Sequence, residues 1–117
     1  MQKNTKTIDA SGKVLGRVAS EVAISLMGKD KASFERERYS GSAVKVTNAG
    51  KIRITVKKLE ELSHARYSGY PGGLKVTRGS FTVKTKGMQE LLRLAIYRML
   101  PGNKLRREMM KNLKIEN

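Results

Sequence analysis

Two stretches of the chain repeat apolar residues at helical spacing. The first lies between positions 15 and 26 and consists of Leu15, Val18, Ala19, Val22, Ala23 and Leu26. The second lies between positions 88 and 99 and consists of Met88, Leu91, Leu92, Ala95, Ile96 and Met99. This spacing gathers apolar side chains on one face of an amphipathic helix. The sequence therefore predicts two helices with one buried face each, ended by Gly28 and by Pro101-Gly102.

Alternation of apolar and polar residues predicts strands. Residues 43–48 and 52–56 both alternate in this way and are separated by a break at Gly50. Alternation is typical of a strand that buries one face. A short β-branched run at 5–10 precedes the first helix, and residues 113–115 alternate near the end of the chain. A strand, a tight turn and a helix thus open the chain, as in a βαβ unit.

The remaining segments carry weaker signals. Residues 29–42 are polar and without periodicity, which predicts a loop, and residues 68–73 hold three glycines and one proline, which also predicts a loop. Residues 57–62 favour a short helix. The β-branched and basic stretch 76–86 is expected to be extended or irregular. A short third helix is expected within 103–111, with Asn103 as its N-cap.

The composition adds a strong positive charge to this picture. The 117 residues contain 25 Lys and Arg against 10 Asp and Glu, for a formal net charge of +15. The excess is +8 in residues 1–58 and +7 in residues 59–117, so no basic tail is attached to a neutral domain. Without repeats or linkers, residues 1–117 are expected to form a single domain.

Cations at this density repel one another unless a polyanion neutralises them. Nucleic acid is the expected polyanion, because each phosphate contact releases counterions. A merely solvated, highly soluble surface is the alternative. A membrane-surface role is disfavoured, because the basic residues do not lie opposite one apolar helical face.

Several classes of chemistry find no support in the residues. The absence of Cys excludes disulfides and thiolate sites. No apolar run approaches the roughly 20 residues of a membrane span, and the first residues do not form a secretory signal. His64 is the only histidine and has no nucleophile or metal-ligand pattern around it, while the adjacent Glu60 and Glu61 are a poor acid–base pair. No catalytic residue, metal, cofactor or small-molecule substrate is expected.

The loop at 67–73 is a candidate contact with RNA. Tyr67 and Tyr70 offer stacking faces, and glycines allow backbone amides to approach phosphates. Arg66 and Lys75 flank the segment. An ordinary glycine-rich surface loop, or tyrosines packed inward against the domain, are the alternatives.

Several motifs in a fixed order resemble those of a known family. They are IDASGKVLGRVAS at 8–20, MGK at 27–29, VTNA at 46–49, RYSGYPGGLK at 66–75, AIYRMLPGNKLRR at 95–107 and LKI at 113–115. Together they cover roughly positions 7–115 and resemble the universal large-subunit ribosomal protein thirteen family in its bacterial form.

The chain departs from the family pattern at several positions. The family usually has His at the position of Tyr67, Gly at Arg98 and Arg106, and Lys at Gly102. The stretch 76–86 is normally helix-forming and acidic in the family. The usual C-terminal extension, with its His-Pro-His and Ala-Gln elements, is lacking, so contacts of that extension are not carried over.

The resemblance implies a fold and a function. The fold would be a three-layer α/β/α domain with a small, mostly parallel four-stranded sheet in the order 3-2-1-4. It places the third strand near 63–68, whereas the alternation places it at 52–56. The function would be that of a structural constituent of the large ribosomal subunit, which binds large-subunit rRNA in early assembly, beside other ribosomal proteins, in the cytoplasm.

A free-standing RNA-binding regulator or RNA chaperone is the alternative function, including repression of the protein's own message. A small nucleic-acid enzyme is the third possibility. The residues expected to contact RNA are Lys13, Arg17, Lys29, Lys31, Arg36, Arg38, Lys51, Lys57, Lys58, Arg66, Tyr67, Tyr70, Gly72, Gly73, Lys75, Arg78, Arg98, Asn103, Lys104, Arg106, Arg107 and Lys111.

Overall fold

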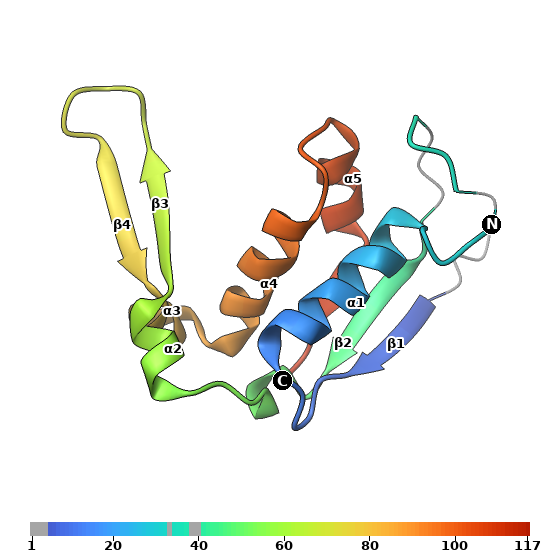
Figure 1. Cartoon of the computed structure of the whole chain (residues 1–117), viewed down its shortest axis with the longest axis horizontal. Coiled ribbons are helices and arrows are strands. Elements are labelled where there is room, and N and C mark those ends of the chain that lie inside the picture. Colours follow the sequence, from blue (N-terminus) through green and yellow to red (C-terminus); the bar gives the residue numbers. More distant parts are fainter. Residues whose placement is uncertain (1–4, 33, 38–40) are drawn as a thin grey trace.

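A computed structural model describes residues 5–32, 34–37 and 41–117 of the chain. It is an α/β structure with a small sheet, a separate hairpin and five α-helices within these ranges (Figure 1). In chain order the elements are β1 (Thr5–Asp9), α1 (Leu15–Met27), β2 (Ala43–Thr47), the short 3-10 helix η1 (Ala49–Lys51), α2 (Val56–Glu61), β3 (Ser63–Tyr67), β4 (Leu74–Arg78), α3 (Gly79–Lys86), α4 (Met88–Met99), α5 (Leu105–Lys111) and β5 (Leu113–Ile115).

The two periodic helices form as predicted, and they supply most of the core. The apolar stripe of α1 is buried, and so are Leu91, Leu92 and Ile96 of α4. Helix α1 ends at Gly28, which has a φ of 84° and donates its backbone N–H to the carbonyl oxygens of Ile24 and Ser25. This is the left-handed conformation that glycine adopts at low cost.

The sheet consists of three parallel strands in the order β1-β2-β5. Val46 of the central strand pairs with Ile8 on one side and with Ile115 on the other. The predicted strands near 43–48 and 113–115 are therefore confirmed. The order 3-2-1-4 and the fourth strand of the sheet are not found among the described residues.

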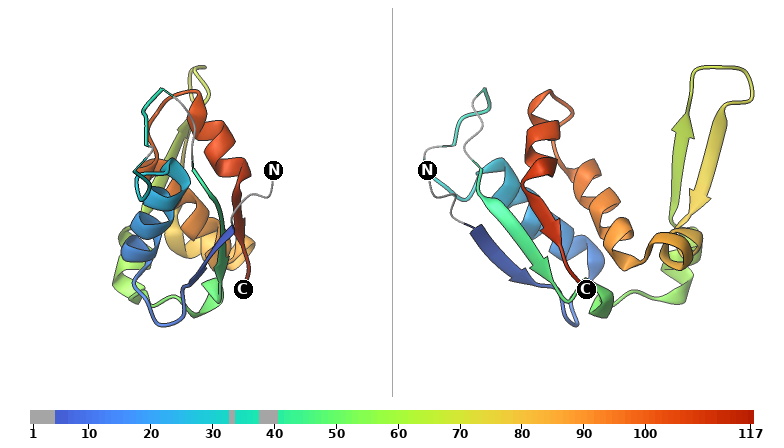
Figure 2. Two further views of the ribbon diagram at one scale, coloured as in Figure 1. Left: turned by 90° about the vertical axis from the view of Figure 1, so that its right-hand side faces the viewer. Right: turned by 180° about the vertical axis from the view of Figure 1, so that it is seen from behind.

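The strand order explains why the described domain has two layers rather than the expected three. Strands added in one direction, joined by right-handed crossovers, place all connecting helices on the same face of the sheet. Figure 2 shows α1 on one face and no helix on the other. The uncovered face carries the polar residues Thr7, Lys45 and Lys114, which alternate with the buried ones.

The alternating segment 52–56 is not a strand, which corrects the sequence pattern. Arg53 makes only an isolated bridge with Val14, and α2 begins at Val56. The Thr55 side chain accepts a hydrogen bond of 3.3 Å from the Lys58 backbone N–H and so caps α2. A helix start therefore interrupts the alternation.

The segment near 63–68 does contain a strand, but it does not join the sheet. Strand β3 pairs with β4 in an antiparallel hairpin that stands apart from β1, β2 and β5 (Figure 1). The expectation drawn from the family resemblance is thus correct for the strand and not for its neighbours.

Residues 79–86 form α3, where the sequence pattern favoured extended or irregular structure. The backbone N–H of Gly79 donates to the Leu62 carbonyl at 2.8 Å, and a Cβ at position 79 would lie 3.0 Å from the Leu59 carbonyl oxygen. The Thr82 hydroxyl donates to the carbonyl of Arg78, which caps α3, and the Thr85 hydroxyl donates to the Phe81 carbonyl. Packing against α2 and α4 therefore overrides the local β propensity.

Helix α5 confirms the predicted third helix. The N-cap is Lys104, whose side chain makes no capping bond, so the predicted N-cap at Asn103 is one residue too early. The Asn103 side-chain oxygen accepts a hydrogen bond of 3.1 Å from the Leu105 backbone N–H just ahead of the helix. Within the described residues, no helix combines the length and the apolar character that crossing a membrane requires.

Candidate nucleic-acid interface

The hairpin and α4 enclose a groove that is rich in positive charge. Its lining includes five cations and, among the described residues, a single carboxylate, that of Glu90. The cations are Arg66 and Lys75 from the hairpin, Lys86 from α3, and Arg93 and Arg98 from α4. Within the described part of the chain, Arg66, Lys75 and Arg98 make no ion pair, so their charges are available to a ligand.

Glu90 is held by one of these cations. The Arg93 guanidinium donates to its two oxygens at 2.7 and 3.0 Å. These hydrogen bonds lower the pKa of Glu90 and raise that of Arg93. The carboxylate thus fixes Arg93 along the wall of the groove.

A second hollow lies on the other side of Arg93 and Tyr97, between α4 and α5. Its lining includes both of these residues together with Asn103, Lys104, Arg106, Arg107, Glu108, Met110 and Lys111. The Arg106 guanidinium stacks on the Tyr97 ring, 3.9 Å from the ring centroid. Such cation–π contacts are favourable and orient the guanidinium plane.

The groove and the second hollow form one continuous surface, because Arg93 and Tyr97 line both. We term this the basic surface. Its nine cations are Arg66, Lys75, Lys86, Arg93, Arg98, Lys104, Arg106, Arg107 and Lys111, and its carboxylates are Glu90 and Glu108. Arginine-rich surfaces of this kind suit the paired oxygens of phosphate groups.

His64 lines the groove but adds no charge to it. Burial, and then the neighbouring Arg98 charge, lower the pKa of His64. The imidazole is therefore neutral at neutral pH. Its Nδ1 is buried and has no hydrogen-bond partner in the part of the chain that the structure describes.

The hairpin loop presents both of its tyrosines to solvent. Tyr67 is 66% exposed and Tyr70 is 76% exposed, which excludes the alternative that they pack inward. The glycines serve the turn itself. Gly72 has a φ of 74°, and a Cβ at Gly73 would collide with the Ser68 hydroxyl. The predicted close approach to RNA at Gly72 and Gly73 stays a prediction.

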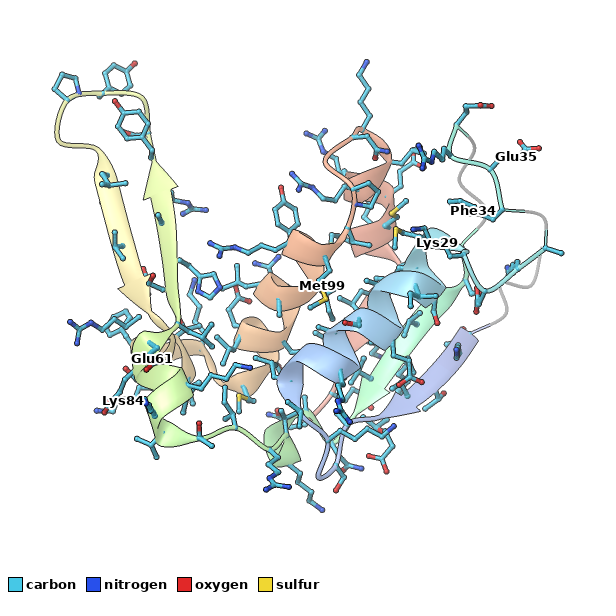
Figure 3. All side chains as sticks on the ribbon, in the orientation of Figure 1. Lys29, Phe34, Glu35, Glu61, Lys84 and Met99 are labelled. Atoms are coloured by element: carbon cyan, nitrogen blue, oxygen red, sulfur yellow. The ribbon has the colours of Figure 1, made fainter. Side chains whose placement is uncertain are left out.

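A third hollow borders the basic surface at Asn103. It is lined by Met27, Lys29, Phe34, Arg36, Pro101, Asn103 and Met109. Figure 3 places Lys29 and Phe34 at the end of the molecule where α4 connects to α5. Lys31 follows in the same segment and donates its backbone N–H to the Gly28 carbonyl. Arg38 lies outside the described residues.

Not all predicted residues belong to these hollows. Those that line none of the three are Lys13, Arg17, Lys31, Lys51, Lys57, Lys58 and Arg78, together with Tyr67, Tyr70, Gly72 and Gly73 of the hairpin loop. Lys13 and Lys51 lie near the start of α1, at the opposite end of that helix from Gly28 (Figure 1). Lys13 pairs with Glu21 at 3.9 Å and Lys57 with Glu61 at 4.0 Å. Lys13, Arg17, Lys51, Lys57, Lys58 and Arg78 do not converge on one surface with the predicted residues that line the hollows.

The sequence analysis missed two cations of the basic surface, Lys86 and Arg93, and two of its aromatic residues, Tyr97 and Phe81. The sequence does carry a signal for Arg93 and Tyr97. Arg93 and Tyr97 lie four residues apart and off the apolar stripe of α4, so they share one exposed helix face.

Nothing in the basic surface resembles a metal centre. Within residues 5–32, 34–37 and 41–117, no three His, Asp or Glu side chains gather in a way that could hold a metal ion. The surface offers recognition of an anionic, partly aromatic ligand.

Comparison with known proteins gives a consistent result. The family described as ribosomal protein L13 matches residues 3–115. The large ribosomal subunit protein uL13 of Aquifex aeolicus is 46% identical over 108 residues, which are 92% of this chain and 74% of that protein. The uL13 protein of Natranaerobius thermophilus is 44% identical over 115 residues, which are 98% of this chain and 80% of that protein. The uL13 protein of Citrifermentans bemidjiense is 47% identical over 109 residues, covering 92% and 75%.

Proposed function

Because this chain belongs to the ribosomal protein L13 family, we propose that it is a structural constituent of the large ribosomal subunit and binds large-subunit rRNA through the basic surface. One observation carries the choice of surface: two cation-lined hollows meet at Arg93 and Tyr97. The family is not an enzyme family, and the chain functions in the ribosome, in the cytoplasm.

The surface suits folded RNA in two ways. Its cations bind phosphates of strands that pass on either side of Tyr97, and counterion release makes each contact favourable. The exposed Tyr67 and Tyr70 at the hairpin tip provide faces on which unpaired bases stack. Because the proposed partner is rRNA itself, the chain needs no other protein of the subunit in order to bind, and we propose that it binds early in assembly. No observation favours the free-standing regulator.

A pair of double variants tests the surface. Arg66→Ala with Arg106→Ala removes one cation from each hollow of the basic surface, whereas Lys84→Ala with Lys114→Ala removes the same charge elsewhere. Lys84 projects from the side of α3 near Glu61, away from the groove (Figure 3). Two solvent-exposed contacts at about 0.7–1.4 kcal/mol each correspond to a loss of about 10- to 100-fold in affinity for a large-subunit rRNA fragment. We expect this loss for the first double variant and a change of less than about threefold for the second.

Filter binding at fixed salt measures both affinities, and gradient sedimentation measures incorporation into large subunits. Equal losses for the two double variants would show that binding depends on net charge alone and not on the basic surface.

The Tyr97 ring gives a separate prediction. Tyr97→Ala removes the platform that orients Arg106, so rRNA affinity should fall about two- to fivefold, as expected for a partly exposed cation–π contact. Tyr97→Phe keeps the ring and should bind like the unmodified chain. The same filter-binding assay measures this, with circular dichroism as a check of folding. A Phe variant as weak as the Ala variant would assign the role to the hydroxyl group instead.

A further inference from the structure

The β3–β4 hairpin has two faces of different chemistry. The antiparallel register places Tyr67 opposite Leu74 and Ala65 opposite Val76. Side chains alternate between the two faces of a strand pair, so these four residues share one face. We term it the apolar hairpin face. The intervening pair, Arg66 with Lys75, lies on the opposite face.

Charge and apolar character are separated along most of these strands, with Arg78 at the base as the one cation on the apolar hairpin face among the described residues of β3 and β4. The face with Arg66 and Lys75 lines the groove of the basic surface. Between the Ser63–Arg78 pair and the loop, the apolar hairpin face carries no cation. It is nonetheless open to solvent: Tyr67 is 66%, Leu74 61% and Val76 59% exposed.

An isolated two-stranded hairpin of this kind is marginally stable in water. None of the residues of β3 and β4 is fully buried in the chain. Clustered exposed apolar residues mark interaction sites more often than inert surface. Both faces of the hairpin therefore require contacts from outside the chain, and their chemistry differs.

We propose that the apolar hairpin face docks onto an apolar, carboxylate-bordered surface of a neighbouring protein in the large subunit. The inference rests on the proposed function. RNA is disfavoured along most of this face, because phosphates require cations and the only planar ring is that of Tyr67 at the loop end, where a base can stack. Leu74, Val76 and Ala65 offer no ring and are left to a protein partner. A second copy of the chain is disfavoured by repulsion between two bodies of charge +15.

The border of the partner's surface follows from charge complementarity. Arg78 closes the base of the apolar hairpin face, opposite Ser63, and makes no ion pair within the described residues. A carboxylate on the partner would pair with it. The hairpin then stands between rRNA on its cationic face and protein on its apolar face.

Photocrosslinking at two adjacent positions tests this arrangement directly. p-Benzoylphenylalanine replaces Leu74 in one chain and Lys75 in another, and each is incorporated into large subunits before irradiation. Because adjacent strand residues point to opposite faces, we expect position 74 to crosslink to a protein of the subunit, identified by mass spectrometry, and position 75 to crosslink to rRNA. Crosslinking of position 74 to rRNA, to a second copy, or to nothing would overturn the proposal.

A binding experiment separates this inference from the proposed function. Leu74→Thr with Val76→Thr places a β-branched residue of high strand propensity at both positions while removing apolar surface. The double variant should bind protein-free rRNA like the unmodified chain. In competition with the unmodified chain for subunits reconstituted with all proteins, it should be about tenfold less abundant. Equal incorporation, or an equal loss on protein-free rRNA, would overturn the docking role. An unmodified chain that enters no subunit would overturn the proposed function instead.

Discussion

Affinity of the chain for large-subunit rRNA should fall by about 1,000- to 100,000-fold as monovalent salt rises from about 50 to about 200 mM. The expectation follows from the nine cations of the basic surface. If about six to ten phosphates are neutralised, the logarithm of affinity falls with the logarithm of salt at a slope of about −5 to −9. Filter binding across a salt series measures the slope directly.

The variants of the basic surface make the salt experiment specific. Arg66→Ala with Arg106→Ala should reduce the magnitude of the slope by about two, because two counterion-releasing contacts are lost. Lys84→Ala with Lys114→Ala should leave the slope unchanged. A slope near zero for the unmodified chain would contradict binding dominated by phosphates.

The helices were predictable because their signals are local. The apolar stripe of α1 and the left-handed Gly28 that ends this helix are both determined by residues close together in sequence. In α4 the stripe ends just before Pro101, as the sequence predicts. Local signals failed at 52–56, where Thr55 starts a helix inside an alternating segment, and at 79–86, where packing against α2 and α4 decides the structure.

The sheet order was not predictable from the pattern. Alternation at Val44 and Val46 shows that one face of β2 is buried, but it does not show which strands lie beside β2. That choice depends on residues far apart in sequence, as in the pairing of Val46 with Ile115. The family resemblance supplied an order, and the described sheet has a different one.

The sequence was sufficient to predict a polyanionic ligand. It was sufficient to predict only part of the surface that binds this ligand. Net charge indicates a polyanion wherever the cations lie. In sequence, Lys13 and Lys51 look no different from Lys75 and Arg106, yet only the latter two line the basic surface. The shared position of Arg93 and Tyr97 between two hollows depends on how α4 packs between the hairpin and α5, which no local pattern encodes.

Leu92→Ala should lower the free energy of unfolding by about 2–5 kcal/mol. Leu92 is 0% exposed and belongs to the same buried cluster as Val22 of α1 and Leu91 of its own helix. Truncation removes buried methyl groups and leaves a cavity that the packed α1–α4 interface fills only in part. Chemical denaturation of the free chain, followed by circular dichroism, measures the loss.

The adjacent residue provides the matched control. The Arg93 side chain is 47% exposed and pairs with Glu90 within one helix, so Arg93→Ala should cost less than about 1 kcal/mol of stability. For rRNA affinity, the order of the two effects should be reversed. Arg93→Ala weakens binding while the fold persists, because Arg93 lines both hollows of the basic surface. Leu92→Ala keeps the affinity of the folded fraction, because its side chain is buried. Equal losses of stability would place Leu92 and Arg93 on the same side of α4, and that is incompatible with a helix that buries one and presents the other to rRNA.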